Sequence, residues 1–216
     1  MRSSKIRPVG RPPVGTAYLA LCGLLLSGCG ARSSAPGVRV FAGFDVSGSM
    51  RPRLAVAALA GSRLAGRLDP GRDTLTLYRI DRQIEEFQDG PAPDSGAGLQ
   101  REIVVALRKE PVRPGTFPAS FWAETARRAK AETRPVSIIL FSDGDNDDQR
   151  PEAAQAIRRA AADMAQNPHV TNVSVCGVSP GNRAALRDTF APLGGRFELL
   201  NLSEPDVQRL ADQTAP

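Results

Sequence analysis

Short apolar runs that alternate with helical patterns constrain the fold of this chain more than any other feature. Apolar residues recur at helical spacing between residues 54 and 68 and again between residues 153 and 164. This alternation predicts an α/β fold: a single doubly wound, Rossmann-like sheet of mostly parallel strands with helices on both faces. The runs that are typical of strands lie at residues 38–44, 74–80, 136–141 and 173–178, with weaker ones at 84–87 and 197–200.

Prolines and glycines mark where the predicted elements begin and end. The run V-S-I-I-L-F from Val136 is almost continuously apolar, which is typical of a central strand buried on both faces. Pro52, Pro118 and Pro151 each precede a helical pattern, and the first turn of a helix tolerates proline because no amide donor is needed there. Residues 90–98 are rich in proline and glycine and are a candidate long loop.

The first 28 residues have the organisation of a bacterial signal peptide. A basic stretch is followed by an apolar stretch from Ala17 to Leu26, which is too short to span a bilayer as a helix. The tetrapeptide Leu26-Ser27-Gly28-Cys29 resembles the lipobox of bacterial lipoproteins, in which the chain is cut before the cysteine and the new terminal cysteine is acylated. The resemblance implies a lipid anchor at Cys29.

Residues 29–37 are small and polar and contain a proline, so we expect a flexible tether before a folded domain at residues 38–216. The expected location is the bacterial cell envelope, outside the cytoplasm and attached to a membrane by lipid. Gly30 stands where lipoproteins retained at the inner membrane often carry Asp, which favours the outer membrane by analogy. The choice between the two membranes stays open.

Of the three cysteines, Cys22 leaves with the signal peptide and Cys29 is the predicted lipid site, so Cys176 has no partner for a disulfide within the chain. Cys176 lies in an apolar run and is interpreted as a small core residue. The formal charge of +5 falls to about +1 without the four basic residues of the leader, and the remaining arginines are scattered. No nucleic-acid partner is therefore expected.

Oxygen-bearing side chains follow several predicted strands on the side where an open α/β sheet binds ligands. The sequence D-V-S-G-S after the first strand places Asp45, Ser47 and Ser49 at alternate positions. Asp143 follows the central strand, and Thr116 precedes a predicted helix. Two carboxylates and three hydroxyls suit a hard divalent cation better than zinc or copper.

These residues resemble the metal-ion-dependent adhesion site of the von Willebrand factor A (VWA) domain family, whose D-x-S-x-S motif is matched in full. The resemblance runs from about residue 38 to the end of the chain. It implies that Ser47 and Ser49 bind Mg²⁺ (or Mn²⁺ or Ca²⁺) directly, that Thr116 supplies a further hydroxyl, and that Asp45 and Asp143 bind directly or through water. It also implies an open position for a Glu or Asp of a partner protein. Whether Asp143 or Asp145 faces the ion is left open.

The same residues allow other interpretations. Ser49 and Thr116 precede helices and are candidate N-caps, and residues 143–148 are a candidate solvated turn. The segment from Gly43 lacks the lysine of a phosphate-binding loop and the spacing of a dinucleotide fingerprint. An EF-hand loop from Asp143 would have Ala154 in place of its bidentate Glu.

The runner-up function is a metal-assisted phosphohydrolase that uses Asp45 and Asp143, with Asp45 as the nucleophile. Ser47 stands where such an enzyme needs a second carboxylate as acid and base. The single histidine, His169, precedes a strand and is expected at the opposite edge of the sheet. Phe121 and Trp122 are expected to pack in the core. A membrane-anchored protein that binds a protein partner through a metal is therefore the leading hypothesis.

Overall fold

The computed structural model describes residues 36–109 and 115–214. The predicted signal peptide at residues 1–28 and the predicted lipid site at Cys29 lie outside the described residues, as does the tether up to residue 35. The compact unit begins at Pro36. Within the described part of the chain, no helix is both long enough and apolar enough to cross a membrane.

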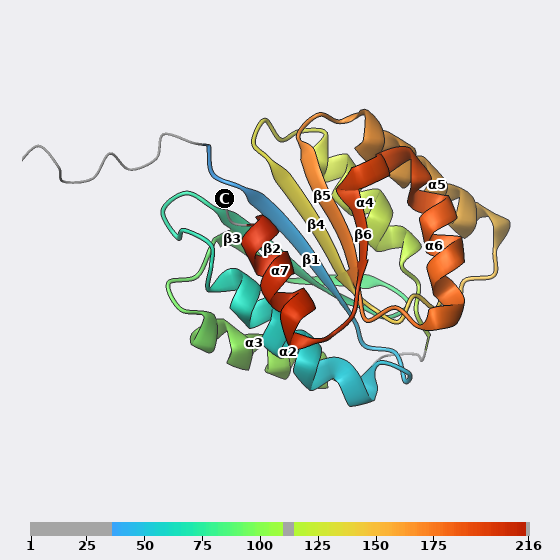
Figure 1. Ribbon diagram of the computed structural model, residues 1–216. Helices are drawn as coiled ribbons and strands as arrows, with labels where there is room; N and C mark the ends of the chain where they lie inside the picture. Colours follow the sequence, from blue (N-terminus) through green and yellow to red (C-terminus); the bar gives the residue numbers. More distant parts are fainter. Residues whose placement is uncertain (1–35, 110–114, 215–216) are drawn as a thin grey trace, which may run out of the picture. The chain divides into compact units, whose positions relative to one another are not determined.

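Six strands form one sheet in the order β3-β2-β1-β4-β5-β6 (Figure 1). Neighbouring strands are parallel except for β2 and β3, which form an antiparallel hairpin at one edge. The predicted doubly wound, mostly parallel sheet is confirmed. The strands are β1 (Arg39–Asp45), β2 (Thr74–Ile80), β3 (Ile84–Pro91), β4 (Val136–Phe141), β5 (Val170–Cys176) and β6 (Phe197–Leu200).

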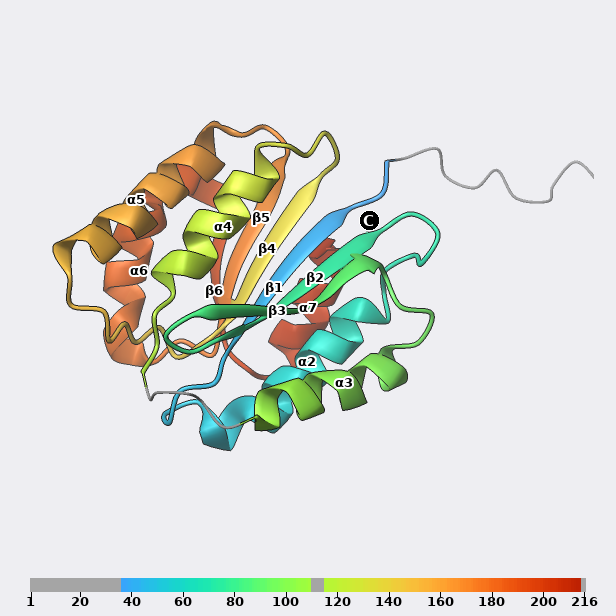
Figure 2. The same cartoon turned by 180° about the vertical axis from the view of Figure 1, so that it is seen from behind.

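Helices cover both faces of this sheet, as Figure 2 shows from behind. Helices α2, α3 and α7 lie on one face, and α4, α5 and α6 lie on the other. The α-helices are α2 (Leu54–Ala65), α3 (Gly96–Arg108), α4 (Ala119–Ala129), α5 (Pro151–Gln166), α6 (Arg183–Phe190) and α7 (Glu204–Thr214). Short 3-10 turns are η1 (Arg51–Arg53), η2 (Pro180–Asn182) and η3 (Ala191–Arg196).

The core consists of two apolar layers, one on each side of the sheet. Successive side chains of a strand point to opposite faces, so the buried residues of the central strands divide between the layers. Phe44 and Phe141 stack with ring centroids 4.9 Å apart in the layer under α2 and α3. Phe121 and Trp122 lie fully buried in the opposite layer, which confirms their expected role in the core.

A glycine in β1 allows the helix above it to pack closely. A Cβ atom at Gly43 would lie 2.6 Å from Ile80 Cδ1 and 2.8 Å from Phe121 Cε2, which is closer than carbon atoms pack. The Phe121 ring therefore occupies the space that a side chain at Gly43 would need. This contact fixes α4 against the central strand and so positions the segment that enters α4.

The prediction of a long loop at residues 90–98 is wrong. Strand β3 continues to Pro91, which is paired with Thr74, and α3 begins at Gly96. The sequence predicts only the start of β3, at residues 84–87, because the rest of this edge strand is polar or lacks a large side chain and half of its residues face solvent. Helix α3 was not predicted, although its buried residues fall at helical spacing: Leu99, Ile103, Ala106 and Leu107.

The bounds of β1 and β5 differ from the prediction by one to three residues. Strand β5 starts at Val170 and ends at Cys176, three residues earlier than expected at its start and two at its end, and Gly177 leaves the strand with a φ of 101°. Cys176 is buried in the core, as expected. His169 directly precedes β5, and its carbonyl accepts a hydrogen bond from the amide of Val136 at the start of β4. The histidine therefore lies at the edge where the strands begin.

Candidate functional site

Asp45 is the last residue of β1 and lies at the centre of a group of polar side chains at the carboxyl edge of the sheet. Its side chain is fully buried, with no exposed surface. One carboxylate oxygen, Oδ1, accepts hydrogen bonds from the Ser47 amide at 2.9 Å and from Thr116 Oγ1 at 3.1 Å. The other, Oδ2, accepts one from Ser142 Oγ at 2.7 Å. The carboxylate is thus held by three different loops.

The two serines of the D-x-S-x-S motif lie together. Ser47 Oγ and Ser49 Oγ are 3.1 Å apart, and Ser47 is buried whereas Ser49 is exposed. The interpretation of Ser49 as an N-cap is wrong because η1 has no side-chain cap hydrogen bond and the Ser49 hydroxyl meets Ser47 instead. The motif therefore presents two adjacent hydroxyl oxygens beside the buried carboxylate.

Thr116 joins this group from a distant part of the chain. Its amide donates to Asp147 Oδ2 at 2.7 Å, and its carbonyl accepts from the Asp147 amide at 2.9 Å. On the other side, the Phe117 amide donates to the carbonyl of Asp81 in the β2–β3 turn. The N-cap interpretation of Thr116 is also wrong, since α4 has no side-chain cap and the threonine hydroxyl donates to Asp45. The segment that carries Thr116 is therefore held by hydrogen bonds to the loop after β4 and to the β2–β3 turn.

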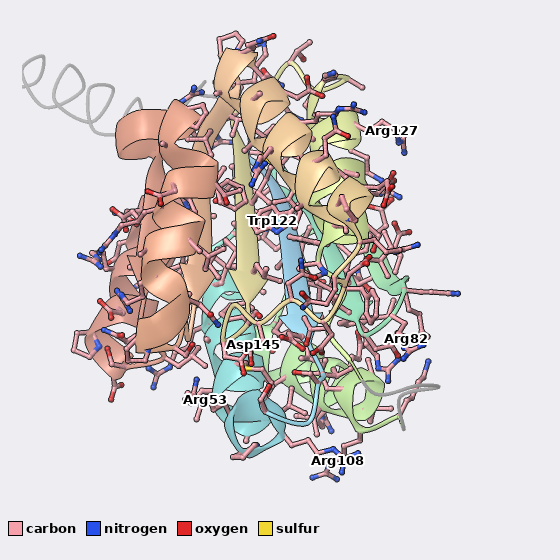
Figure 3. The ribbon with its side chains drawn as sticks, turned by 90° about the vertical axis from the view of Figure 1, so that its right-hand side faces the viewer. Arg53, Arg82, Arg108, Trp122, Arg127 and Asp145 are labelled. Atoms are coloured by element: carbon pink, nitrogen blue, oxygen red, sulfur yellow. The ribbon has the colours of Figure 1, made fainter. Side chains whose placement is uncertain are left out.

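Asp143 and Asp145 occupy different positions in the loop after β4. Asp143 is buried, and its Oδ1 accepts a hydrogen bond from the Asp145 amide at 3.1 Å. Asp145 is exposed, and its Oδ1 accepts from Asn182 Nδ2 at 2.6 Å. Figure 3 shows Asp145 at the edge where β4 ends. Of the two carboxylates, Asp143 is the one whose charge acts on Asp45.

Burial raises the pKa of Asp45 above its ordinary value, against hydrogen bonds from Ser47 and Ser142 that lower it, and the charge of Asp143 raises it further. Among the described residues, no arginine or lysine forms an ion pair with Asp45 or Asp143 (salt bridges join other carboxylates). An ionised carboxylate buried without a counter-charge is costly, and protonation or a neighbouring cation relieves that cost.

Two residues of this group were missed from the sequence. Ser142, directly before Asp143, donates its hydroxyl to Asp45 across 97 positions of the chain. Asp147 holds Thr116 in place. The interpretation of residues 143–148 as only a solvated turn is wrong for this reason, although Asp148 and Arg150 do form a local ion pair. No spacing rule identifies Ser142, because its role depends on β1 and β4 ending side by side.

The geometry gives no support to the phosphohydrolase alternative. A nucleophilic carboxylate must reach the phosphorus atom of a substrate, but both oxygens of Asp45 accept hydrogen bonds and neither is exposed. Within the described parts of the chain, no three side chains of His, Cys, Asp or Glu gather as a metal-ligating group. The oxygen donors that do gather are hydroxyls around one carboxylate, with Asp143 nearby.

A pocket of about 170 Å³ opens next to this group. Ser142 and Asp145 line its polar side, and Leu140, Val175 and Trp122 line its apolar side. Figure 3 shows Trp122 inside the molecule between the sheet and the helices. Trp122 therefore contributes to this pocket as well as to the core.

Comparisons with known proteins show what the fold of this chain resembles. No protein-family model matches the sequence, and no curated protein matches it. A von Willebrand factor type A protein from Catenulispora acidiphila has a similar structure, with a TM-score of 0.62 and 19% identity over 84% of this chain and 42% of that one. The ArnB paralog VWA2 from Sulfolobus acidocaldarius matches with a TM-score of 0.57 and 20% identity over 85% of this chain and 45% of that one.

An aerotolerance-related membrane protein from Bacteroides fragilis also matches, with a TM-score of 0.59 and 17% identity over 83% of this chain and 98% of that one. This chain spans less than half of the first two proteins and nearly all of the third. At these identities the likeness establishes the fold alone. The domain that the structure describes has a VWA-like fold.

Proposed function

We propose that this chain is a membrane-anchored lipoprotein of the bacterial cell envelope whose VWA-like domain binds a divalent cation and, through it, an acidic side chain of a protein partner. The observation that carries the proposal is Asp45, a fully buried carboxylate surrounded by hydroxyls at the carboxyl edge of the sheet. No basic side chain among the described residues compensates its charge. Recognition of this kind makes and breaks no covalent bond.

The donor set fits Mg²⁺, with Mn²⁺ or Ca²⁺ as alternatives. The hydroxyls of Ser47, Ser49 and Thr116 and the carboxylates of Asp45 and Asp143 are hard oxygen donors, which these ions prefer. When bound, the cation would compensate the buried charge and supply a position for a partner's carboxylate. Because the protein contributes only two carboxylates, we expect Mg²⁺ to keep several waters and to bind weakly until the partner's Glu or Asp is present.

The residues of the chain itself orient the donors before any ion binds. Three hydrogen bonds hold the Asp45 carboxylate in one orientation. The paired backbone bonds between Thr116 and Asp147 hold the loop that brings the threonine hydroxyl to Asp45. Groups held in this way lose little conformational entropy on binding, so the ion meets donors that are already in place.

The two acidic residues after β4 should contribute differently to cation affinity. Asp143→Asn should weaken Mg²⁺ binding by about tenfold or more, because it removes one of two nearby charges. Asp145→Asn is the matched control and should change affinity by less than about threefold, since Asp145 is exposed and bonded to Asn182. Titration calorimetry with Mg²⁺, and with Mn²⁺ as a second probe, measures both. A larger loss of Mg²⁺ affinity in Asp145→Asn than in Asp143→Asn would instead identify Asp145 as the ligand.

Membrane attachment is proposed to depend on Cys29. Labelled palmitate should enter the wild-type protein during growth and should not enter Cys29→Ser, which should move from the membrane fraction to the released fraction. Cys176→Ser is the control, because Cys176 is buried in the core and should not be acylated. The likeness to a membrane protein supports this part of the proposal. A Cys29→Ser protein that stays on the membrane without label would contradict it.

A further inference from the structure

A second pocket lies at the same edge of the sheet, on the side of β5 and β6. We term it the arginine pocket, because two arginines line it among apolar and small polar residues, which include Pro52, Arg53, Val56, Pro180, Arg183 and Leu202. Arg53 ends η1, Val56 lies in the first turn of α2, and Arg183 begins α6. Figure 3 shows Arg53 at the edge where Asp145 also lies.

The two arginines are held in place by neutral groups. Arg53 Nη1 donates to the carbonyl of Gly177 at 2.8 Å, and Arg183 Nη2 donates to the carbonyl of Leu199 at 3.1 Å. Neither arginine forms an ion pair with a carboxylate of residues 36–109 or 115–214, whereas Arg63 on the same helix as Val56 is paired with Glu204. A guanidinium has five N–H donors, so these contacts orient both groups and leave donors for an anion.

The arginine pocket adjoins the group of oxygen donors. Arg53 follows Ser49 by four residues in the same segment, after β1. The amide of Ser179, which also lines the pocket, donates to the carbonyl of Asp143 at 2.9 Å. The loop that carries Asp143 is therefore hydrogen-bonded to the loop that lines the pocket, and a short segment of a partner can cover both places.

Charge and apolar surface together indicate what fits there. Val56 is 43% exposed, which is high for a large apolar residue, and Leu202 is half-buried beside it. An acidic side chain has an apolar stem and a carboxylate, which matches apolar residues next to two cations without carboxylate partners. The acidic residues at this edge of the sheet lie in the loop after β4, whereas Arg53 follows β1 and Arg183 follows β5. The charge at this edge of the sheet is therefore negative in the loop after β4 and positive at the arginine pocket.

We propose that the arginine pocket binds a second Glu or Asp of the same partner segment whose first acidic side chain binds the cation. This inference rests on the proposed function, and it specifies the partner: a segment with two acidic side chains a few residues apart. The first carboxylate binds at the oxygen donors, and the second binds between Arg53 and Arg183. The apolar stem of the second side chain contacts Val56 and Leu202.

Synthetic hexapeptides with blocked ends provide the test with the full-length chain. One peptide carries a single Glu among glycines, and the others carry two Glu separated by one to four glycines. In Mg²⁺, at least one two-Glu peptide should bind about threefold to fivefold more tightly than the single-Glu peptide. Arg53→Gln and Arg183→Gln should each reduce this ratio toward one. Arg187→Gln, an exposed arginine of α6 outside the pocket, should keep it. The ratio of the two-Glu affinity to the single-Glu affinity is compared, because a general loss of binding lowers both affinities equally and leaves their ratio unchanged.

NMR of the Nε–H groups of Arg53 and Arg183 in the wild-type protein gives a second readout that needs no variant. Both signals should shift with the two-Glu peptide, in Mg²⁺ and also, more weakly, in EDTA. Unchanged arginine signals while a peptide binds in Mg²⁺ would overturn the pocket and leave the cation site standing. Arginine shifts with no effect of Mg²⁺ on affinity would overturn the proposed function and support the pocket. Binding of no peptide, or larger shifts with inorganic phosphate, would overturn this inference.

Discussion

Mg²⁺ should stabilise the wild-type protein through the proposed site, and replacing Asp45 with Asn should abolish this stabilisation. A ligand at one hundred times its Kd stabilises the folded state by about 2.7 kcal/mol, which corresponds to a rise of roughly 5–10 °C in Tm for a chain of this size. Asp45 accepts three hydrogen bonds at the centre of the oxygen donors, so no other residue can replace its charge. Thermal unfolding in Mg²⁺ and in EDTA measures the difference.

The Tm in EDTA separates loss of the cation from loss of the fold. Asn fits the same space, and the Ser142 hydroxyl can turn to accept a hydrogen bond from the new amide group. Burial raises the pKa of Asp45, so the ionised group costs stability without a cation, and Asp45→Asn should be at least as stable as the wild type in EDTA. Asp163→Asn, on a surface ion pair with Lys130, should keep the full effect of Mg²⁺.

The same variant tests partner binding. Immobilised wild-type protein should retain a protein from native membranes in Mg²⁺ and release it in EDTA, and Asp45→Asn should not retain it in either condition. If Asp45→Asn retains the same protein in Mg²⁺, partner binding does not depend on the oxygen donors around Asp45, and the proposal is wrong. Metal-dependent release of phosphate from a generic ester by the wild type would instead support the enzyme hypothesis.

Phe121→Ala should cause a large loss of stability, about 3–5 kcal/mol. The ring is fully buried and contacts Tyr78 and Trp122 edge-on, with centroids 5.8 and 5.1 Å away. It also fills the space above Gly43, which has no side chain to close the resulting cavity. Urea unfolding measures the loss, with fluorescence of the single tryptophan, Trp122, as the signal.

Val105→Ala is the control for this prediction. Val105 is 66% exposed, so its truncation should change the free energy of unfolding by no more than about 0.5 kcal/mol. A loss below about 1 kcal/mol for Phe121→Ala would mean that α4 does not pack on β1 through this ring. That result would also remove the support for the position of Thr116, which lies just before this helix.

The strands that were predicted to the residue are those whose local pattern agrees with their place in the fold. Strands β2, β4 and β6 match the predicted runs. Strands β2 and β4 are buried along nearly all of their length, and the edge strand β6 is short and carries three apolar residues. Strand β3 and helix α3 were predicted poorly. The edge strand carries many polar residues, and a helix that follows a proline-rich segment has no clear beginning in the sequence.

The candidate site also contains residues that the sequence identifies and residues that it does not. A local motif carries Asp45, Ser47 and Ser49, and the end of a central strand marks Asp143, so these positions could be named without coordinates. The roles of Ser142 and Asp147 could not, because each depends on a side chain that reaches a loop far along the chain: 97 positions to Asp45 for the first and 31 to Thr116 for the second. The spacing of residues along the sequence does not show which neighbouring loop a side chain points toward.

The direction of β1 has a consequence for how the protein meets its surroundings. The described chain begins at Pro36, close to the first residue of β1, and Asp45 closes the same strand. A strand of seven residues extends for roughly 20 Å. The described chain therefore enters the sheet at the end of β1 that lies opposite the oxygen donors around Asp45. Under the proposed membrane attachment, a partner that binds at the oxygen donors meets the sheet at the end away from Pro36, where the described chain begins.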